Sequence, residues 1–274
     1  MAYRLSPEND WYFLDQGRGP NLLLLHGLGA SSFSWRHNLG PLAAHFRVLA
    51  PDLPPQGRSL ASLTADYSLA SQVRSILNFL DRRGLAQAAL AGNSLGGGLA
   101  LLLARNYPER FPALILLAPA APLTRLPYLF YPLRVPGLGH LAAALLGPWI
   151  IPPTLRLVYH NPRLITPEVV AGYAAPYRSL RRRLALGRLC RQLQLLPLEQ
   201  VESLLQQIKQ PVSLIWGGQD RIMPRRQANW LKVRLPQAEL HLLPEIGHAP
   251  QEEAPEQVNQ IIIAFLGRSL KNKQ

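Results

Sequence analysis

Two hydrophobic patterns alternate along the chain: short runs of apolar residues, and longer stretches in which apolar residues recur every three or four positions. The short runs are typical of buried strands, and the longer spacing is typical of helices that pack on a sheet. The runs predict strands over residues 11–15, 21–26, 47–52, 87–91, 113–117, 212–216 and 239–243. The helical spacing predicts helices over residues 34–45, 67–83, 95–106, 225–234 and 255–266.

This alternation of strand and helix predicts one α/β domain, with a mostly parallel, twisted sheet and helices on both faces. The alternation stops near residue 118 and resumes after about residue 210, and the stretch between is rich in Pro, Leu and Arg. Within that stretch, residues 177–196 predict a basic amphipathic helix. We therefore expect a core built from residues 1–119 and 211–274, with a helical lid inserted at residues 120–210.

Residues 135–155 carry no charge and are long enough to span a bilayer, but four prolines interrupt them. A lid or an interfacial segment fits this stretch better than a spanning helix. The chain begins with early charges that do not resemble a signal peptide, and its single cysteine, Cys190, is compatible with a reducing compartment. We expect a cytoplasmic protein that can lie at the periphery of a membrane.

The positive charge is concentrated in the expected lid. The formal net charge is +13, and +8 of it falls between residues 121 and 200, which hold ten arginines and two glutamates. Such a bias predicts binding to an anionic membrane surface or to an acidic carrier protein, although a solvated basic face gives the same pattern. No known nucleic-acid-binding motif accompanies the charge, so nucleic acid is the weaker interpretation.

The strongest candidate for chemistry is the sequence Gly-Asn-Ser-Leu-Gly at residues 92–96. An apolar strand precedes it and a helix follows it, so Ser94 is expected on a sharp turn that pushes its hydroxyl out of the backbone. Such a turn is crowded and requires small residues two positions to either side, which Gly92 and Gly96 supply. Ser94 is therefore the candidate nucleophile.

A serine hydroxyl needs a base to take its proton, and the base needs an acid to orient it. Among the seven histidines, His248 follows a predicted strand and precedes the last predicted helix. Asp220 directly follows another predicted strand, at the same edge of the sheet as Ser94. Asp52 also follows a strand and is the rival acid, although capping a turn is the better interpretation of its role.

An oxyanion requires two backbone donors, which we expect to be the N–H groups of Leu95 and Leu28. Leu95 follows the candidate nucleophile, and Leu28 lies in the loop after the strand at residues 21–26. His26 is expected to hold that loop. No Cys/His cluster has the spacing of metal ligands, so the sequence implies neither a metal nor a cofactor.

Several motifs together resemble the series found in the α/β-hydrolase superfamily, in its serine-nucleophile branch of esterases and lipases. They are His-Gly-Leu-Gly-Ala at 26–30, Asp-Leu-Pro at 52–54, Gly-Asn-Ser-Leu-Gly-Gly at 92–97, Gly-Gly-Gln-Asp at 217–220 and Gly-His at 247–248. The resemblance covers almost the whole chain except the lid. It implies the α/β-hydrolase fold and a triad in the chain order Ser94, Asp220, His248.

The turn around Ser94 is similar to those of pheophytinase-like esterases and of C–C bond hydrolases that act on ring-cleavage products. The latter usually have a Gly-Pro-Gly-type oxyanion loop, whereas residues 27–30 read Gly-Leu-Gly-Ala. Superfamily members with an aspartate nucleophile, such as dehalogenases and epoxide hydrolases, are excluded by Ser94.

We therefore expect a serine hydrolase that cleaves a carboxylic ester with a hydrophobic acyl or alcohol group. The apolar lid favours such a substrate, and Tyr128, Phe130 and Trp149 are its candidate pocket residues. A C–C bond hydrolase, and a receptor or accessory protein of the same fold with little turnover, are the alternatives.

Overall fold

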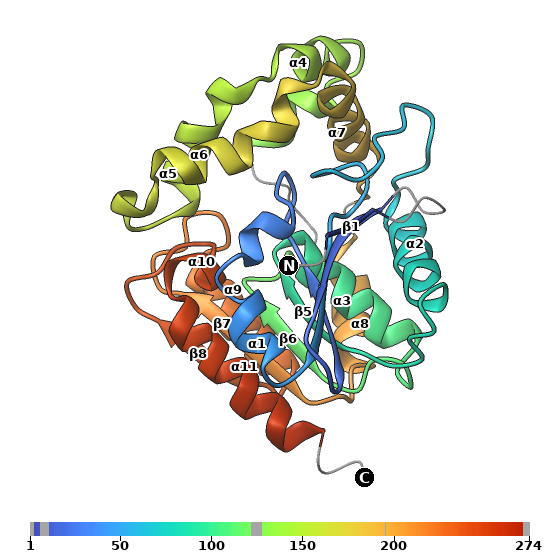
Figure 1. Ribbon diagram of the computed structural model, residues 1–274, viewed down its shortest axis with the longest axis vertical. Helices are drawn as coiled ribbons and strands as arrows, with labels where there is room; N and C mark the ends of the chain where they lie inside the picture. Colours follow the sequence, from blue (N-terminus) through green and yellow to red (C-terminus); the bar gives the residue numbers. More distant parts are fainter. Residues whose placement is uncertain (1–2, 6–10, 122–127, 195, 271–274) are drawn as a thin grey trace.

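An eight-stranded sheet forms the centre of the computed structural model, which describes residues 3–5, 11–121, 128–194 and 196–270 (Figure 1). The strand order is β1-β2-β4-β3-β5-β6-β7-β8; β1 and β2 are antiparallel to their neighbours, and the other pairs are parallel. The strands are β1 Tyr3–Leu5, β2 Tyr12–Gln16, β3 Asn21–Leu25, β4 Arg47–Pro51, β5 Ala89–Asn93, β6 Leu114–Leu117, β7 Val212–Gly217 and β8 Glu239–Leu243.

Helices lie on both faces of this sheet and above one of its ends. The α-helices are α1 Leu39–Ala43, α2 Leu69–Asp81, α3 Leu95–Asn106, α4 Gly139–Leu145, α5 Ile151–Val158, α6 Pro167–Ala174, α7 Leu180–Gln192, α8 Leu198–Gln206, α9 Arg225–Arg234, α10 Pro250–Glu253 and α11 Pro255–Ser269. Five short 3-10 helices in the described chain are η1 Ser32–Trp35, η2 Tyr128–Arg134, η3 Pro148–Ile150, η4 Pro162–Leu164 and η5 Ala175–Arg178.

The two faces of the sheet are buried by different helices. Alternate residues of a strand point to opposite faces, so Leu23 and Leu25 pack in the cluster with α2, α3, α8 and α9. Leu22 and Leu24 point the other way, into the cluster with α1 and α11. Both faces of the central strands are covered, which is why these strands are continuous apolar runs in the sequence.

The predicted mostly parallel sheet with helices on both faces is confirmed. The helix predicted over residues 34–45 is wrong, because the chain there forms only η1 and the short α1. A continuous helix would place Pro41 in its interior, where proline lacks the N–H for the helical hydrogen bond; instead Pro41 lies in the first turn of α1. The sequence patterns also missed the short strand β1.

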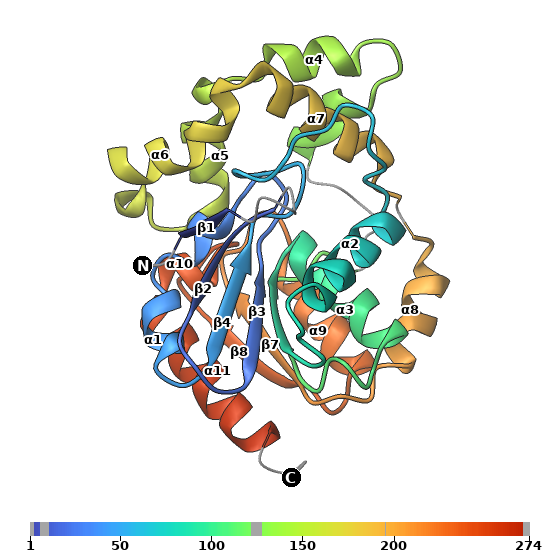
Figure 2. The same cartoon turned by 45° about the vertical axis from the view of Figure 1, so that its right-hand side comes forward.

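A lid formed by the segments from η2 to α7 lies over the end of the sheet at which β5 runs into α3 (Figures 1 and 2). The boundary expected at residue 210 needs correction, because α8 packs against α3 and α9 within the core. The lid therefore ends before Leu198. The basic helix predicted over residues 177–196 is the shorter α7, preceded by η5.

Candidate active site

Ser94 occupies a strained turn between β5 and α3. Its backbone has φ 53° and ψ −115°, in the left-handed range that non-glycine residues rarely adopt. A Cβ at Gly92 would lie 2.4 Å from the carbonyl oxygen of Gly96, and a Cβ at Gly96 would lie 2.2 Å from that of Leu25. Both positions therefore exclude any side chain, as the sequence pattern predicts for a turn of this kind.

His248 and Asp220 lie beside this turn, on the loops after β8 and β7. The His248 Nδ1 atom is 2.8 Å from the Asp220 Oδ2 atom, and the Asp220 side chain is fully buried. The other oxygen of Asp220 accepts hydrogen bonds of 2.8 Å from the N–H groups of Ile222 and Met223. With both oxygens engaged, the carboxylate holds the imidazole with its proton on Nδ1 and leaves Nε2 available.

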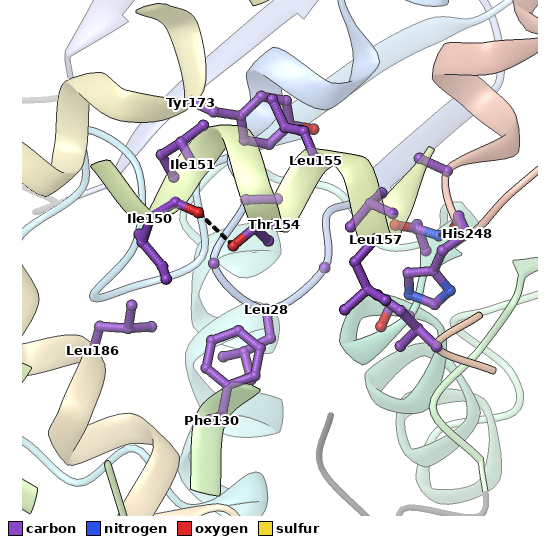
Figure 3. A pocket seen from close by; sticks show the side chains of 18 of the residues that line it. Leu28, Phe130, Ile150, Ile151, Thr154, Leu155, Leu157, Tyr173, Leu186 and His248 are labelled. Carbon is purple, nitrogen blue, oxygen red and sulfur yellow. Dashed lines mark hydrogen bonds between the residues drawn. The ribbon is translucent and has the colours of Figure 1, made fainter. Parts of the chain in front are cut away.

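Ser94 and His248 both line one pocket, in which Figure 3 shows the His248 ring. No hydrogen bond joins the Ser94 hydroxyl to a described residue, so the expected Ser94–His248 bond is not formed in this structure. The two loops are nevertheless tied together by Asn93, whose amide donates to the carbonyl oxygens of His248 and Leu117, each at 3.1 Å. The sequence analysis assigned no role to Asn93.

Two backbone N–H groups are available next to Ser94. Leu95 is the first residue of α3, and Leu28 lies in the loop after β3; neither N–H donates a hydrogen bond to any residue that the structure describes. The neighbouring Gly29 N–H donates to the Gln56 side chain at 2.6 Å, which fixes the loop. The site therefore offers two free donors, one of them at a helix N-terminus, where the helix dipole favours negative charge.

The His26 side chain holds the base of the Leu28 loop. Its Nδ1 donates to the carbonyl oxygen of Gly27, and its Nε2 accepts from the N–H of Leu53, both at 2.8 Å. Nε2 can accept only when the ring is neutral. Complete burial lowers the pKa of His26 and favours that neutral form.

Asp52, the rival acid, is occupied in holding a turn. Its two oxygens accept hydrogen bonds of 2.6 Å from the N–H groups of Ser32 and Arg58. A Cβ at Gly57 would lie 2.1 Å from Asp52 Oδ2, so the turn closes tightly on the carboxylate. Asp220, and not Asp52, is hydrogen-bonded to His248.

The pocket is mainly apolar and lies between the core and the lid (Figure 3). The space between its lining residues is about 980 Å³, a volume that includes space open to solvent. Its apolar lining includes Leu28, Phe130, Leu133, Leu146, Ile150, Ile151, Leu155, Leu157, Val158, Leu186 and Ile222.

The three pocket residues expected from the sequence have different outcomes. Phe130 lines the pocket. Trp149 does not, because its side chain points to solvent and is 65% exposed. The side chain of Tyr128 is outside the described residues.

A buried polar cluster at the pocket wall was missed by the sequence analysis. Glu252 accepts hydrogen bonds from the hydroxyl groups of Tyr159, at 2.8 Å, and Tyr173, at 2.5 Å, and it pairs with Arg36. Burial raises the pKa of Glu252, against the opposing effect of Arg36. The signal available in the sequence was its position four residues after His248, but its partners come from the lid and from Arg36, which directly follows η1.

The neighbouring Glu253 connects the His248 loop to the lid. Its carboxylate accepts from the N–H groups of Gly247, at 2.8 Å, and His160, at 2.7 Å. The N–H of His248 itself donates to the carbonyl oxygen of Val158 at 2.7 Å. The end of α5 and the candidate base are therefore held in one hydrogen-bonded unit.

Neither a metal site nor a reactive thiol is evident in the described part of the chain. Its His, Cys, Asp and Glu side chains form no group of three that could hold a metal ion. Cys190 is buried in α7, and burial raises the pKa of its thiol to about 12, which keeps it protonated.

The chain matches known proteins over most of its length. Residues 22–261 match the sequence profile of the alpha/beta hydrolase family. The chain is 30% identical to the uncharacterised hydrolase YugF of Bacillus subtilis, over 93% of this chain and 92% of that protein. It is 31% identical to the 2-hydroxy-6-oxo-6-phenylhexa-2,4-dienoate hydrolase of Burkholderia cepacia, over 92% and 89%.

Among solved structures, a thermophilic esterase from Thermogutta terrifontis superimposes with a TM-score of 0.80 at 25% identity, over 94% of this chain and 93% of that one. The family profile covers the parallel strands from β3 to β8 except the first residue of β3, together with the turn at Ser94 and the loops of Asp220 and His248. The chain therefore belongs to the alpha/beta hydrolase family.

Proposed function

We propose that this protein is a serine hydrolase that cleaves a neutral carboxylic ester with an apolar acyl or alcohol group. The observation that carries the proposal is one apolar pocket shared by Ser94 on its strained turn and by His248 with its Asp220 partner. Leu28, whose N–H is free, lines the same pocket, and the free N–H of Leu95 belongs to the residue directly after Ser94. These are the parts that acyl transfer through a serine requires.

The proposed reaction begins when Ser94 Oγ attacks the ester carbonyl and His248 Nε2 takes the hydroxyl proton. The negative oxygen that forms is stabilised by the N–H groups of Leu28 and Leu95. His248 then gives its proton to the departing alcohol, and a water molecule activated by the same nitrogen releases the acyl group. Rotation of the Ser94 side chain brings Oγ within reach of His248 when substrate binds.

The polarity of the pocket favours an ester over the acidic substrates of the C–C bond hydrolases. The substrate named for the Burkholderia cepacia relative is a dienoate, which carries a carboxylate. No Lys or Arg of the described chain lines the pocket, and its one carboxylate, Glu252, adds no positive charge. A buried carboxylate without a cationic partner is costly, so we favour a neutral substrate.

The test is a panel of p-nitrophenyl esters of increasing acyl length beside a phenylhexadienoate ring-cleavage product, with Ser94→Ala as the control. We expect turnover that favours medium-length acyl chains and that falls to background in the control. Faster cleavage of the dienoate would refute the ester assignment. Absence of turnover on every substrate would favour the receptor or accessory role.

A further inference from the structure

The arginines of α7 do not form the free basic face that the sequence suggested. Arg181 donates to the carbonyl oxygen of Ala61, and Arg182 donates to that of Ser59, at 2.7 and 2.6 Å. Arg188 donates to the Ala65 carbonyl oxygen at 2.7 Å. Leu186 and Leu189 of α7 are buried in the lid. These arginines keep their positive charge, but their N–H donors are used within the molecule.

The neighbouring helix α4 carries an apolar surface, formed by Leu138, Leu141, Leu145 and the following Trp149, which we call the apolar ridge. Their side chains are 62%, 57%, 65% and 65% exposed, in that order. The three leucines are spaced by three and four residues and so share one helical face. Their exposure requires an explanation, because most large apolar side chains of the described chain are buried.

The opposite face of α4 is packed against α7, so the helix is held in place with the ridge facing outward. Ala143 is fully buried, and a Cβ at Gly187 of α7 would lie 2.7 Å from the Cβ of Ala143. Gly139 is likewise buried against the Leu133 carbonyl oxygen. One face of α4 is thus fixed to the lid, while the other displays leucines to the outside.

We propose that the apolar ridge docks on a lipid bilayer that contains anionic headgroups. Helix α4 lies at one end of the longest axis of the molecule, so a flat surface can reach it without meeting the core (Figures 1 and 2). Residues 135–155 carry no formal charge, and the segment around them has ten arginines against two glutamates. An apolar ridge set in a basic lid suits a bilayer with negative headgroups better than a second, equally basic copy of this chain.

The exposed side chains of the ridge are next in sequence to side chains that line the pocket. Leu145 and Trp149 point outward, whereas their neighbours Leu146 and Ile150 line the pocket. No single described helix is long and apolar enough to cross a bilayer, although α4 and the segment Pro148–Val158 pass such a test together with a bend of 86°. A bent, amphipathic pair of this kind fits the bilayer interface. If the proposed esterase function holds, an apolar ester can pass from the membrane to Ser94 beside this segment.

The test measures binding to vesicles and does not depend on turnover. Sedimentation with phosphatidylcholine vesicles is compared with sedimentation when phosphatidylglycerol is mixed in. We expect binding to the anionic vesicles, lowered about tenfold or more in the double variant Leu141→Ser, Leu145→Ser, because the buried leucine area is lost. Val233→Ser is the matched control, since Val233 is 76% exposed on α9 of the core.

The fluorescence of Trp149 in the unmodified protein provides a second measurement. Its emission should shift to the blue when anionic vesicles are added, and the shift should be absent from Trp149→Phe. No binding to either vesicle at low salt would overturn the proposal and would leave an acidic carrier protein or a second copy as the occupant. Binding that the double variant retains, or equal binding to neutral vesicles, would also overturn it. If the unmodified protein binds anionic vesicles but hydrolyses no ester, the result would count against the proposed function alone.

Discussion

The sheet edge and the lid are both held by hydrogen bonds to backbone groups, but with opposite polarity. At the sheet edge, the carboxylates of Asp220, Asp52 and Glu253 accept from backbone N–H groups. In the lid, the guanidinium groups of Arg181 and Arg182 donate to backbone carbonyl oxygens of the core. Both sets use charge, yet they differ in reach and burial.

The difference lies in the freedom of the side chains. Asp220 has a short side chain that is fully buried, so it fixes a loop and the His248 ring together. An arginine has a long, flexible side chain, and Arg181 is exposed along α7. Carboxylates therefore make the site rigid, whereas arginines tether a lid whose contacts can open one at a time.

The largest effect is expected when the carboxylate of Asp220, which holds the active-site loops rigid, is removed. In Asp220→Asn, the amide oxygen can still accept from Ile222 and Met223, but the NH₂ group then faces His248 Nδ1 and favours the wrong tautomer. We expect kcat for an ester to fall by about four orders of magnitude, with little change in the thermal midpoint. Steady-state kinetics and thermal unfolding measure both. Asp220 would not be the acid if Asp52→Asn, still folded, lost turnover while Asp220→Asn retained it.

An intermediate effect is expected when the arginine hydrogen bonds between α7 and the core are removed. The double variant Arg181→Gln, Arg182→Gln removes donors to Ala61 and Ser59. We expect the local opening free energy of α7 to fall by roughly 1 to 3 kcal/mol, seen as faster amide exchange there, while exchange in α3 stays unchanged.

The matched control for the tether is Arg178→Gln, because Arg178 is exposed at the end of η5, just before α7, and its side chain donates to no described residue. Exchange that rises equally in α3 would mean that lid and core open as one unit. That result would remove the contrast between the two regions.

The smallest effect concerns the pH dependence of the free energy of unfolding, through His26. Burial lowers the pKa of His26 below its ordinary 6.5, so the unfolded chain binds its proton first as the pH falls. Stability should therefore be lost as the pH drops from about 6.5 toward the lower folded pKa, by at most about 1.4 kcal/mol per pH unit for one proton. Denaturant unfolding of the wild type and His26→Gln across this window measures the difference. If the free energy of unfolding changes with pH equally in the two proteins, the pKa of His26 is the same in the folded and unfolded states.

The positions of the site residues could largely be predicted from the sequence. The turn at Ser94 is a local feature, because the strand, the two small glycines and the helix all lie within a few residues. Asp220 and His248 follow parallel strands, whose carboxyl ends meet at one edge of the sheet. Local pattern and strand direction were therefore sufficient to bring these three residues together.

Other features were decided only by the tertiary structure. Helical spacing shows which residues share a face but not what that face meets, so the sequence could not show that Arg182 bonds to the core or that Trp149 points outward. Glu252 was missed for the same reason, since its partners Tyr159 and Tyr173 come from the distant lid. Contacts between segments far apart in the chain depend on how the lid docks, which short-range patterns do not encode.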